Sequence, residues 1–189
     1  PTGGSSAAVI DVHAHVVLAE TFGAAGGLGP EMGGQDGDAP WFRVGDYRLD
    51  GVRYQGSPFM DPALRLERMA DAGIDFQVLS PNPLTFLHFA DPAVAVGFCR
   101  THNDALAGLV ARYPDRLAGC AALPMQDIGA AVEELDRAVT DLGLLGGYVG
   151  TDMPHRLDAP GMDRFYEAVT RLDVPLFLHP SPAGIDGPP

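Results

Sequence analysis

Short apolar segments alternate with amphipathic segments along most of this chain. Runs rich in branched and apolar residues predict strands, whereas apolar residues spaced three and four apart predict helices. The expected strands are 8–12, 74–80, 117–123, 147–150 and 174–178, and the expected helices are 62–72, 92–113, 128–142 and 162–172. Because strands alternate with helices and are apolar on both faces, the order predicts an α/β fold with a parallel sheet covered by helices.

The starts of three predicted helices are marked by aspartates. Asp61 and Asp91 each precede a proline, which combines an N-cap with a proline in the first turn. Asp127 precedes a segment whose apolar residues form one stripe at helical spacing, with charged residues on the opposite side. These signals fix where the helices begin.

Two architectures satisfy this order of elements, an open doubly wound sheet and a (β/α) TIM-type barrel. No glycine-rich nucleotide-binding motif follows any strand, and polar residues recur at strand carboxyl ends, where barrel enzymes place their chemistry. Both observations favour the barrel. A complete barrel needs about 250 residues, whereas this chain has 189. We therefore expect 1–189 to be the N-terminal portion of one barrel domain, supplying about the first five strands, with an inserted loop or hairpin at about 19–60.

Three histidines follow or end predicted strands. His13 and His15 come just after the first strand, and residues two apart in a strand share a face. His179 ends the fifth strand, which lies across a barrel from the first, so the three side chains are expected to converge. Three imidazoles suit Zn²⁺, with Fe, Co or Mn as alternatives. Hydrogen-bonded structural histidines are the competing interpretation.

Other polar residues near these strand ends are weaker candidates. Asp11 shares the alternation of His13 and His15, and it either accepts a hydrogen bond from a ligand ring or bonds the backbone. His88 and His155 lie in loops after the second and fourth strands, so both are candidates for substrate binding. The remaining histidine, His102, falls within a predicted helix and is expected to be packed or solvated.

Composition narrows the class of partner. The formal net charge is −13, which argues against nucleic acid or an anionic membrane, although one local arginine or metal still allows a small anionic substrate. The two cysteines, Cys99 and Cys120, lie in apolar segments and predict buried free thiols in a reducing cytoplasm. No apolar run is long enough to cross a bilayer. We therefore expect a cytoplasmic protein.

Several motifs resemble one known superfamily. The start IDVHAH at 10–15 resembles the amidohydrolase superfamily. The segments DPALRLERM at 61–69 and AGIDFQVLS at 72–80 are similar to aminocarboxymuconate-semialdehyde decarboxylase and related metal-dependent decarboxylases, as is FLHP at 177–180. The resemblance covers nearly the whole chain after residue 9.

The resemblance implies a metal-dependent, non-oxidative decarboxylase of a small unsaturated or aromatic carboxylic acid. It makes His13, His15 and His179 ligands of a divalent metal, with Zn²⁺ as the expected ion. It aligns Arg53 with an arginine that binds a substrate carboxylate, for which a planar guanidinium is well suited, with Arg43 and Arg48 as alternatives. The family's base histidine and metal-ligand aspartate are expected beyond residue 189, so no catalytic base is assigned. The resemblance also implies a homodimer for the full-length protein.

Two alternatives stay open. A hydrolase or hydratase of the same superfamily would use the same fold and metal on another substrate. A noncatalytic or split-barrel fragment would instead require a partner chain. Release of CO₂, as opposed to release of an acid, separates the decarboxylase from the hydrolase.

Overall fold

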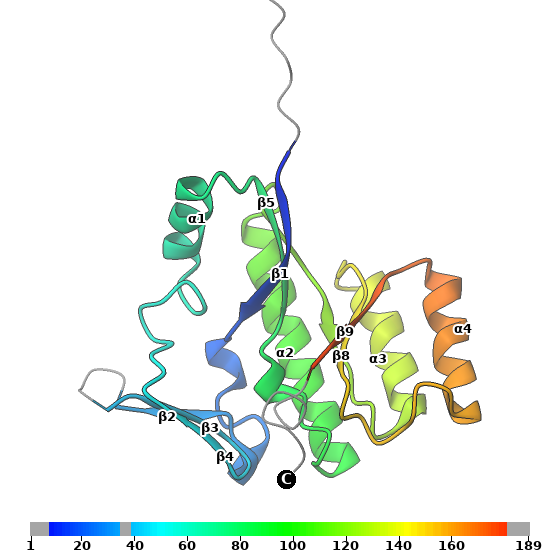
Figure 1. The fold of residues 1–189 in the computed structure, drawn as a ribbon. Helices are drawn as coiled ribbons and strands as arrows, with labels where there is room; N and C mark the ends of the chain where they lie inside the picture. Colours follow the sequence, from blue (N-terminus) through cyan, green and yellow to red (C-terminus); the bar gives the residue numbers. More distant parts are fainter. Residues whose placement is uncertain (1–7, 35–38, 181–189) are drawn as a thin grey trace, which may run out of the picture.

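The computed structural model describes residues 8–34 and 39–180, and its centre is a set of parallel strands (Figure 1). They are β1 (Ile10–Val16), β5 (Phe76–Pro81), β6 (Leu117–Gly119), β7 (Ala121–Ala122), β8 (Gly147–Gly150) and β9 (Leu176–His179). Strands pair in the orders β1-β5-β6 and β7-β8-β9, all in parallel. The segments β6 and β7 are separated only by Cys120, whose amide donates to the carbonyl of Leu79 at 2.8 Å. The strands therefore lie side by side in sequence order.

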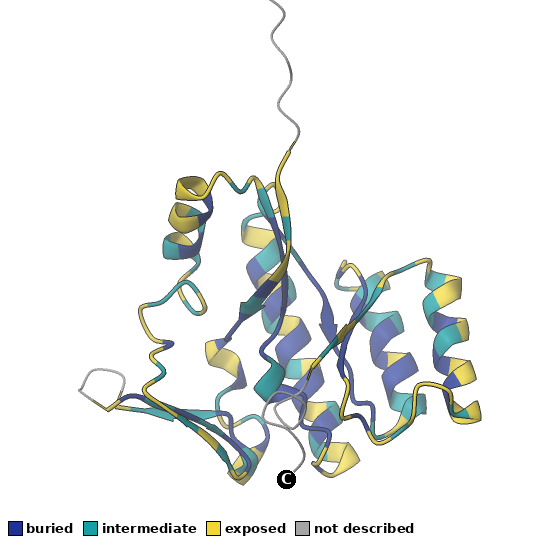
Figure 2. Cartoon of the chain, in the orientation of Figure 1, coloured by how far each residue is buried: buried dark blue, intermediate teal, exposed yellow. Residues whose placement is uncertain are grey.

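The helices begin where the sequence predicts. They are α1 (Pro62–Asp71), α2 (Pro92–Arg112), α3 (Ile128–Thr140) and α4 (Asp163–Leu172). The carboxylates of Asp61, Asp91 and Asp127 each accept backbone amides of the first turn. In Figure 2 the buried faces of α2, α3 and α4 point toward the strands and the exposed faces point away. Their apolar stripes meet the strand side chains in one core, which includes Leu79, Leu106, Met125, Leu135 and Phe165, each 0% exposed.

The segment between β1 and α1 forms a small separate sheet. After the 3₁₀ turns η1 (Ala19–Thr21) and η2 (Gly26–Leu28), the strands β2 (Glu31–Gly33), β3 (Trp41–Val44) and β4 (Tyr47–Asp50) pair antiparallel. The expected hairpin is β3–β4, whereas β2 was not predicted because three residues carry no readable alternation. Phe42 and Val44 anchor this sheet in a second apolar cluster with Leu87 and Phe98. Two further 3₁₀ turns, η3 (Pro83–Thr85) and η4 (Pro160–Met162), follow β5 and β8.

Strand β1 departs from the regular alternation expected for it. It advances three residues, from Asp11 to Ala14, while β5 advances two, from Gln77 to Leu79. The extra residue is a bulge, which rotates the side chains that precede it relative to those that follow. Asp11 consequently bonds Gln77 on the helix-facing side and does not share the face of His13 and His15. The expectation that Asp11 joins those histidines on one face is wrong for this reason.

A buried polar network joins α2 to β7 and α3. Asn103 of α2 is 0% exposed, and its amide donates to the carbonyl of Ala122 at 2.9 Å and to Glu134 at 2.7 Å. Its oxygen accepts the amide of Ala122 at 2.8 Å. The side chain thus pairs with strand backbone as a neighbouring strand would, and Arg137 neutralises the buried Glu134 at 2.7 Å.

Asn103→Leu is expected to lower the free energy of unfolding by about 2–4 kcal/mol, because it leaves the buried amide and carbonyl of Ala122 without this partner and removes one donor from Glu134. Urea unfolding of the variant and the wild type measures this loss. Asp104→Ala is the matched control, since it removes a largely exposed ion pair with Arg137 from the next position of the same helix. That change is expected to cost less than about 1 kcal/mol. Equal losses in the two variants would contradict the role given to Asn103.

Both cysteines are buried and free, as predicted. Over the part of the chain that the structure describes, no helix is both long enough and apolar enough to cross a membrane.

Candidate metal centre

Three histidine rings converge where β1 and β9 approach each other. The Nε2 atom of His13 lies 3.2 Å from Nε2 of His15 and 3.2 Å from Nε2 of His179. The three ring centroids are 4.9 to 5.1 Å apart, and the planes meet nearly at right angles. The prediction from strand ends, that residues separated by more than 160 positions come together, is therefore met by the geometry.

Hydrogen bonds orient two of these rings. The Nδ1 atom of His15 lies 3.0 Å from the carbonyl oxygen of Pro81, and Nδ1 of His179 lies 2.6 Å from that of Pro180. A carbonyl only accepts, so each Nδ1 carries the hydrogen and each Nε2 presents a lone pair to the centre. Such carbonyl partners are typical of metal-binding histidines, whose tautomer they fix.

The spacing of the three nitrogens fits a metal ion better than it fits hydrogen bonds alone. With lone pairs on His15 and His179, a neutral His13 has one Nε2 hydrogen at most and satisfies only one of its two contacts. Tetrahedral nitrogen ligands at about 2.0–2.1 Å from a metal lie about 3.3–3.4 Å apart, close to the observed 3.2 Å. Among the described residues these three form the group of histidine, cysteine and carboxylate side chains close enough to share one ion.

The environment favours the neutral, metal-binding form of His15. Burial, followed by the neighbouring His179 and His13, lowers its pKa to about 4, while the Pro81 carbonyl opposes the shift. Metal binding requires a neutral imidazole. A ring with this pKa needs no deprotonation at neutral pH before it coordinates an ion.

An aromatic wall lines one side of the three histidines. Tyr148 of β8 lies 5.6 Å from the ring of His179 and 6.1 Å from that of His15. Phe86 stacks with Tyr148 at 6.1 Å, and the ring of His88 stacks on Phe86 at 5.4 Å with an interplanar angle of 11°. His88 is 7% exposed, and its Nδ1 lies 2.8 Å from a carboxylate oxygen of Asp152. His88 thus joins the loops that follow β5 and β8, and Phe86 lies between it and the centre.

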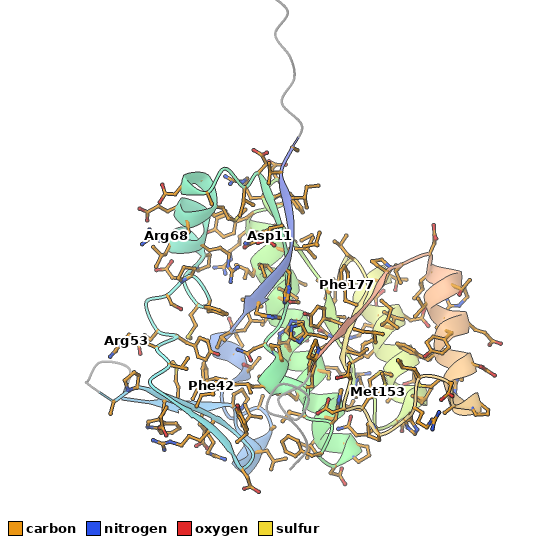
Figure 3. All side chains as sticks on the ribbon, in the orientation of Figure 1. Asp11, Phe42, Arg53, Arg68, Met153 and Phe177 are labelled. Atoms are coloured by element: carbon orange, nitrogen blue, oxygen red, sulfur yellow. The ribbon has the colours of Figure 1, made fainter. Side chains whose placement is uncertain are left out.

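The other predicted substrate-binding residues lie apart from the histidines. Arg53 is exposed in the segment between β4 and α1, and in the view of Figure 3 it lies beside the small sheet, across β1 from Phe177. His155 is half-buried in the turns after β8. A cleft of about 280 Å³ opens beside the histidines, lined by Asp11, His13, His15, Phe59, Arg65 and Gln77. Arg65 and Gln77 were not predicted as site residues, because neither lies at the carboxyl end of a strand, although both fall within the segments 61–69 and 72–80 that carry the family resemblance.

The comparison with known families agrees with this geometry. The sequence model described as amidohydrolase matches residues 10–188. The chain belongs to the amidohydrolase family. The resemblance inferred from the HxH and HP motifs is thereby confirmed, as is the prediction of an α/β fold with parallel strands.

Relatives of this amidohydrolase include decarboxylases. It is 39% identical over 127 residues to the gamma-resorcylate decarboxylase of Rhodococcus jostii, covering 62% of this chain and 39% of that protein. It is 33% identical over 121 residues to the 2-amino-3-carboxymuconate-6-semialdehyde decarboxylase of Dictyostelium discoideum, covering 64% of this chain and 34% of that protein. The amidohydrolase chain thus spans less than half the length of these relatives.

A solved structure shares the fold of this amidohydrolase. The crystal structure of a dihydroxybenzoic acid decarboxylase from Polaromonas sp. JS666, with bound manganese and the inhibitor 2-nitroresorcinol, matches with a TM-score of 0.70 and 30% identity. The match covers 93% of this chain and 50% of that one. The neighbouring structure supports a divalent metal for the family to which this chain belongs.

Proposed function

We propose that this chain provides the metal-binding half of a non-oxidative decarboxylase that acts on a small aromatic carboxylic acid. The convergence of three imidazole Nε2 atoms at the strand ends carries the proposal, and the decarboxylases among its relatives support the reaction class. The reaction replaces a carboxylate on carbon by a hydrogen: the C–C bond breaks, CO₂ leaves, and a proton is delivered to the ring carbon. It needs no oxidant or reductant.

His13, His15 and His179 would hold the ion. A divalent cation bound there acts as a Lewis acid toward substrate oxygens. The carbonyls of Pro81 and Pro180 keep the lone pairs of His15 and His179 aimed at the centre. The aromatic rings of Tyr148 and Phe86 exclude water from one side. Donation of the proton to the ring carbon is assigned to a residue beyond 189. Zn²⁺ suits the donor set, and Mn²⁺ is the ion in the Polaromonas structure.

We further propose that the strands are consecutive strands of a TIM-type barrel, with 1–189 as its N-terminal portion. Val9, Ile10 and Val12 at β1 are 51%, 56% and 52% exposed, and Leu178 of β9 is 48% exposed. Apolar side chains on two unpaired edges favour aggregation unless further strands cover them. The alternative is a split barrel, in which strands of a partner chain cover these edges.

We also propose residues for the substrate side of the site. Arg53, His88 and His155 are candidates for the substrate side of the site, and a rearrangement of the segment before α1 would be needed for Arg53 to reach it. We also propose a homodimer, which the family resemblance supports, and a cytoplasmic location, which the two buried free cysteines support.

The deciding experiment incubates the full-length protein with Mn²⁺ or Zn²⁺ and a set of carboxyl-¹³C-labelled dihydroxybenzoates. Mass spectrometry is expected to detect labelled CO₂ and the parent phenol in stoichiometric amounts, with both lost after chelation of the metal. Products heavier than the substrate by one water would favour a hydratase or hydrolase. Metal binding without turnover of any carboxylated aromatic acid would favour the noncatalytic alternative.

A further inference from the structure

We infer that Arg65 is a positioning residue that fixes the spacing of the metal-binding histidines of β1, through a hydrogen-bonded circuit on the opposite side of the strand. This inference rests on the metal centre proposed above. It concerns a residue of α1 that lines the cleft beside the histidines and is not one of the three proposed metal ligands.

The circuit encloses the His13-Ala14-His15 segment. The amide of His13 donates to Oδ1 of Asp11 at 3.0 Å, and the side-chain amide of Gln77 donates to Oδ2 of the same carboxylate at 2.8 Å. The guanidinium of Arg65 donates to the side-chain oxygen of Gln77 at 2.7 Å and to the carbonyl of His15 at 2.6 Å. The His15 end of the tripeptide is therefore held by Arg65 of α1, and the His13 end is held by Asp11, which Gln77 of β5 fixes in turn.

The bulge in β1 explains why the hydrogen-bonded circuit is needed. Between Asp11 and Ala14 the regular pairing with β5 is interrupted, so the backbone around His13 lacks the ladder that normally fixes a strand. The circuit supplies hydrogen bonds in place of that ladder. It spans the interval in which the ring of His13 must turn toward His15 and His179.

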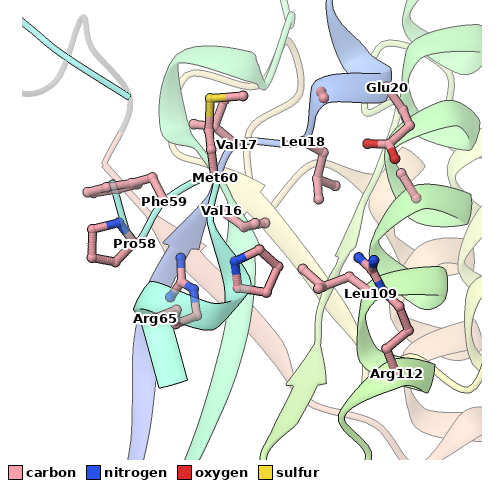
Figure 4. A pocket seen from close by; sticks show the side chains of 13 residues that line it. Val16, Val17, Leu18, Glu20, Pro58, Phe59, Met60, Arg65, Leu109 and Arg112 are labelled. Atoms are coloured by element: carbon pink, nitrogen blue, oxygen red, sulfur yellow. The ribbon is translucent and has the colours of Figure 1, made fainter. Parts of the chain in front are cut away.

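The burial and the hydrogen bonds of Arg65 suit it to this role. Its side chain is 6% exposed, and Figure 4 shows it beside Phe59 and Val16 at one end of a cavity of about 240 Å³ on the outer side of β1. Because the hydrogen bonds from Arg65 to Gln77 and to His15 diverge from one planar group, they hold these two residues at a fixed separation. Lysine has a single nitrogen and cannot reproduce that fork.

The test measures binding of Mn²⁺ and of Co²⁺ to the full-length protein, with Arg65→Lys, Arg65→Met and Gln77→Leu as variants. Loss of a residue that supports a metal ligand typically weakens metal affinity about 10–100-fold, and that loss is expected for all three. The visible absorption of bound Co²⁺ is expected to shift, because ligand geometry changes while the ligands remain. Arg68→Met is the matched control, since Arg68 is exposed on the same helix.

The outcomes separate this inference from the proposed function. If the wild-type protein binds neither ion, the metal centre itself fails. If the wild type binds the metal, and folded Arg65→Met binds it within twofold of the wild-type affinity with an unchanged Co²⁺ spectrum, the positioning role of Arg65 is refuted. Thermal unfolding of the metal-free variants identifies any that are unfolded. If Arg65→Met is unfolded, the test uses Arg65→Lys, which keeps the charge and one donor nitrogen. A Co²⁺ shift in Arg65→Lys with an unfolding midpoint near that of the wild type supports positioning over general stability.

Discussion

His179→Ala is expected to abolish tight metal binding and, with it, decarboxylation by the full-length protein. The variant removes a nitrogen that lies 3.2 Å from Nε2 of His13, and it leaves His13 and His15 on a single strand. Loss of a residue that supports a metal ligand weakens metal affinity about 10–100-fold, and loss of the ligand itself should weaken it more. Titration calorimetry with Mn²⁺ or Zn²⁺ measures the affinity, and metal analysis after dialysis measures the occupancy.

The control for this substitution is His155→Ala. His155 is half-buried in the turns that follow β8, the strand next to β9. Its replacement is also a histidine-to-alanine change, but it removes none of the three converging imidazoles. Metal affinity of His155→Ala is expected to stay within about twofold of the wild type. If His179→Ala keeps wild-type affinity, the three histidines form a hydrogen-bonded structural cluster, and the metal interpretation must be abandoned.

The fold was readable from the sequence because local and long-range signals agree. The aspartate caps at Asp61, Asp91 and Asp127 lie at helix starts, and the apolar periodicity changes between strand and helix where the elements change. Strand boundaries were less accurate, and β1 runs through both histidines to Val16. Polar side chains at a strand end carry the same local signal whether they continue the strand or leave it.

The candidate site could be predicted in part from the sequence. Parallel strands all point their carboxyl ends to one rim, which brings His179 to His13 and His15 without any local clue. The bulge was not readable, because one extra residue in β1 depends on its pairing with β5. For the same reason the face of Asp11 was predicted incorrectly, although the alternative of a bond to backbone is met by the amide of His13, and Arg65 and Gln77 were missed. Their roles arise from contacts between α1, β1 and β5 that no spacing within one segment encodes.

A second large effect is expected from the buried His102, which lies outside the metal centre. Burial in α2 lowers its pKa to about 4, from an ordinary value of 6.5, although Asn103 beside it opposes the shift. Below pH 6.5 the unfolded chain therefore binds a proton that the folded chain excludes, so stability falls as the pH falls from 6.5 toward 4. For this pKa difference the loss is about 2 kcal/mol at pH 5.

His102→Met should remove that part of the pH dependence, because methionine fills a similar apolar space beside Phe98 without a titrating group. Urea unfolding of the metal-free wild type and variant at pH 7 and pH 5 gives four free energies, and the useful quantity is the difference between the two pH-dependent losses. The other histidines, including His15, are common to both proteins and cancel in that difference. A wild type that loses about 2 kcal/mol more than His102→Met on acidification supports the assignment. Equal losses would mean that His102 accepts its proton in the folded state, and the packing of α2 against the strands would then have to admit a charge.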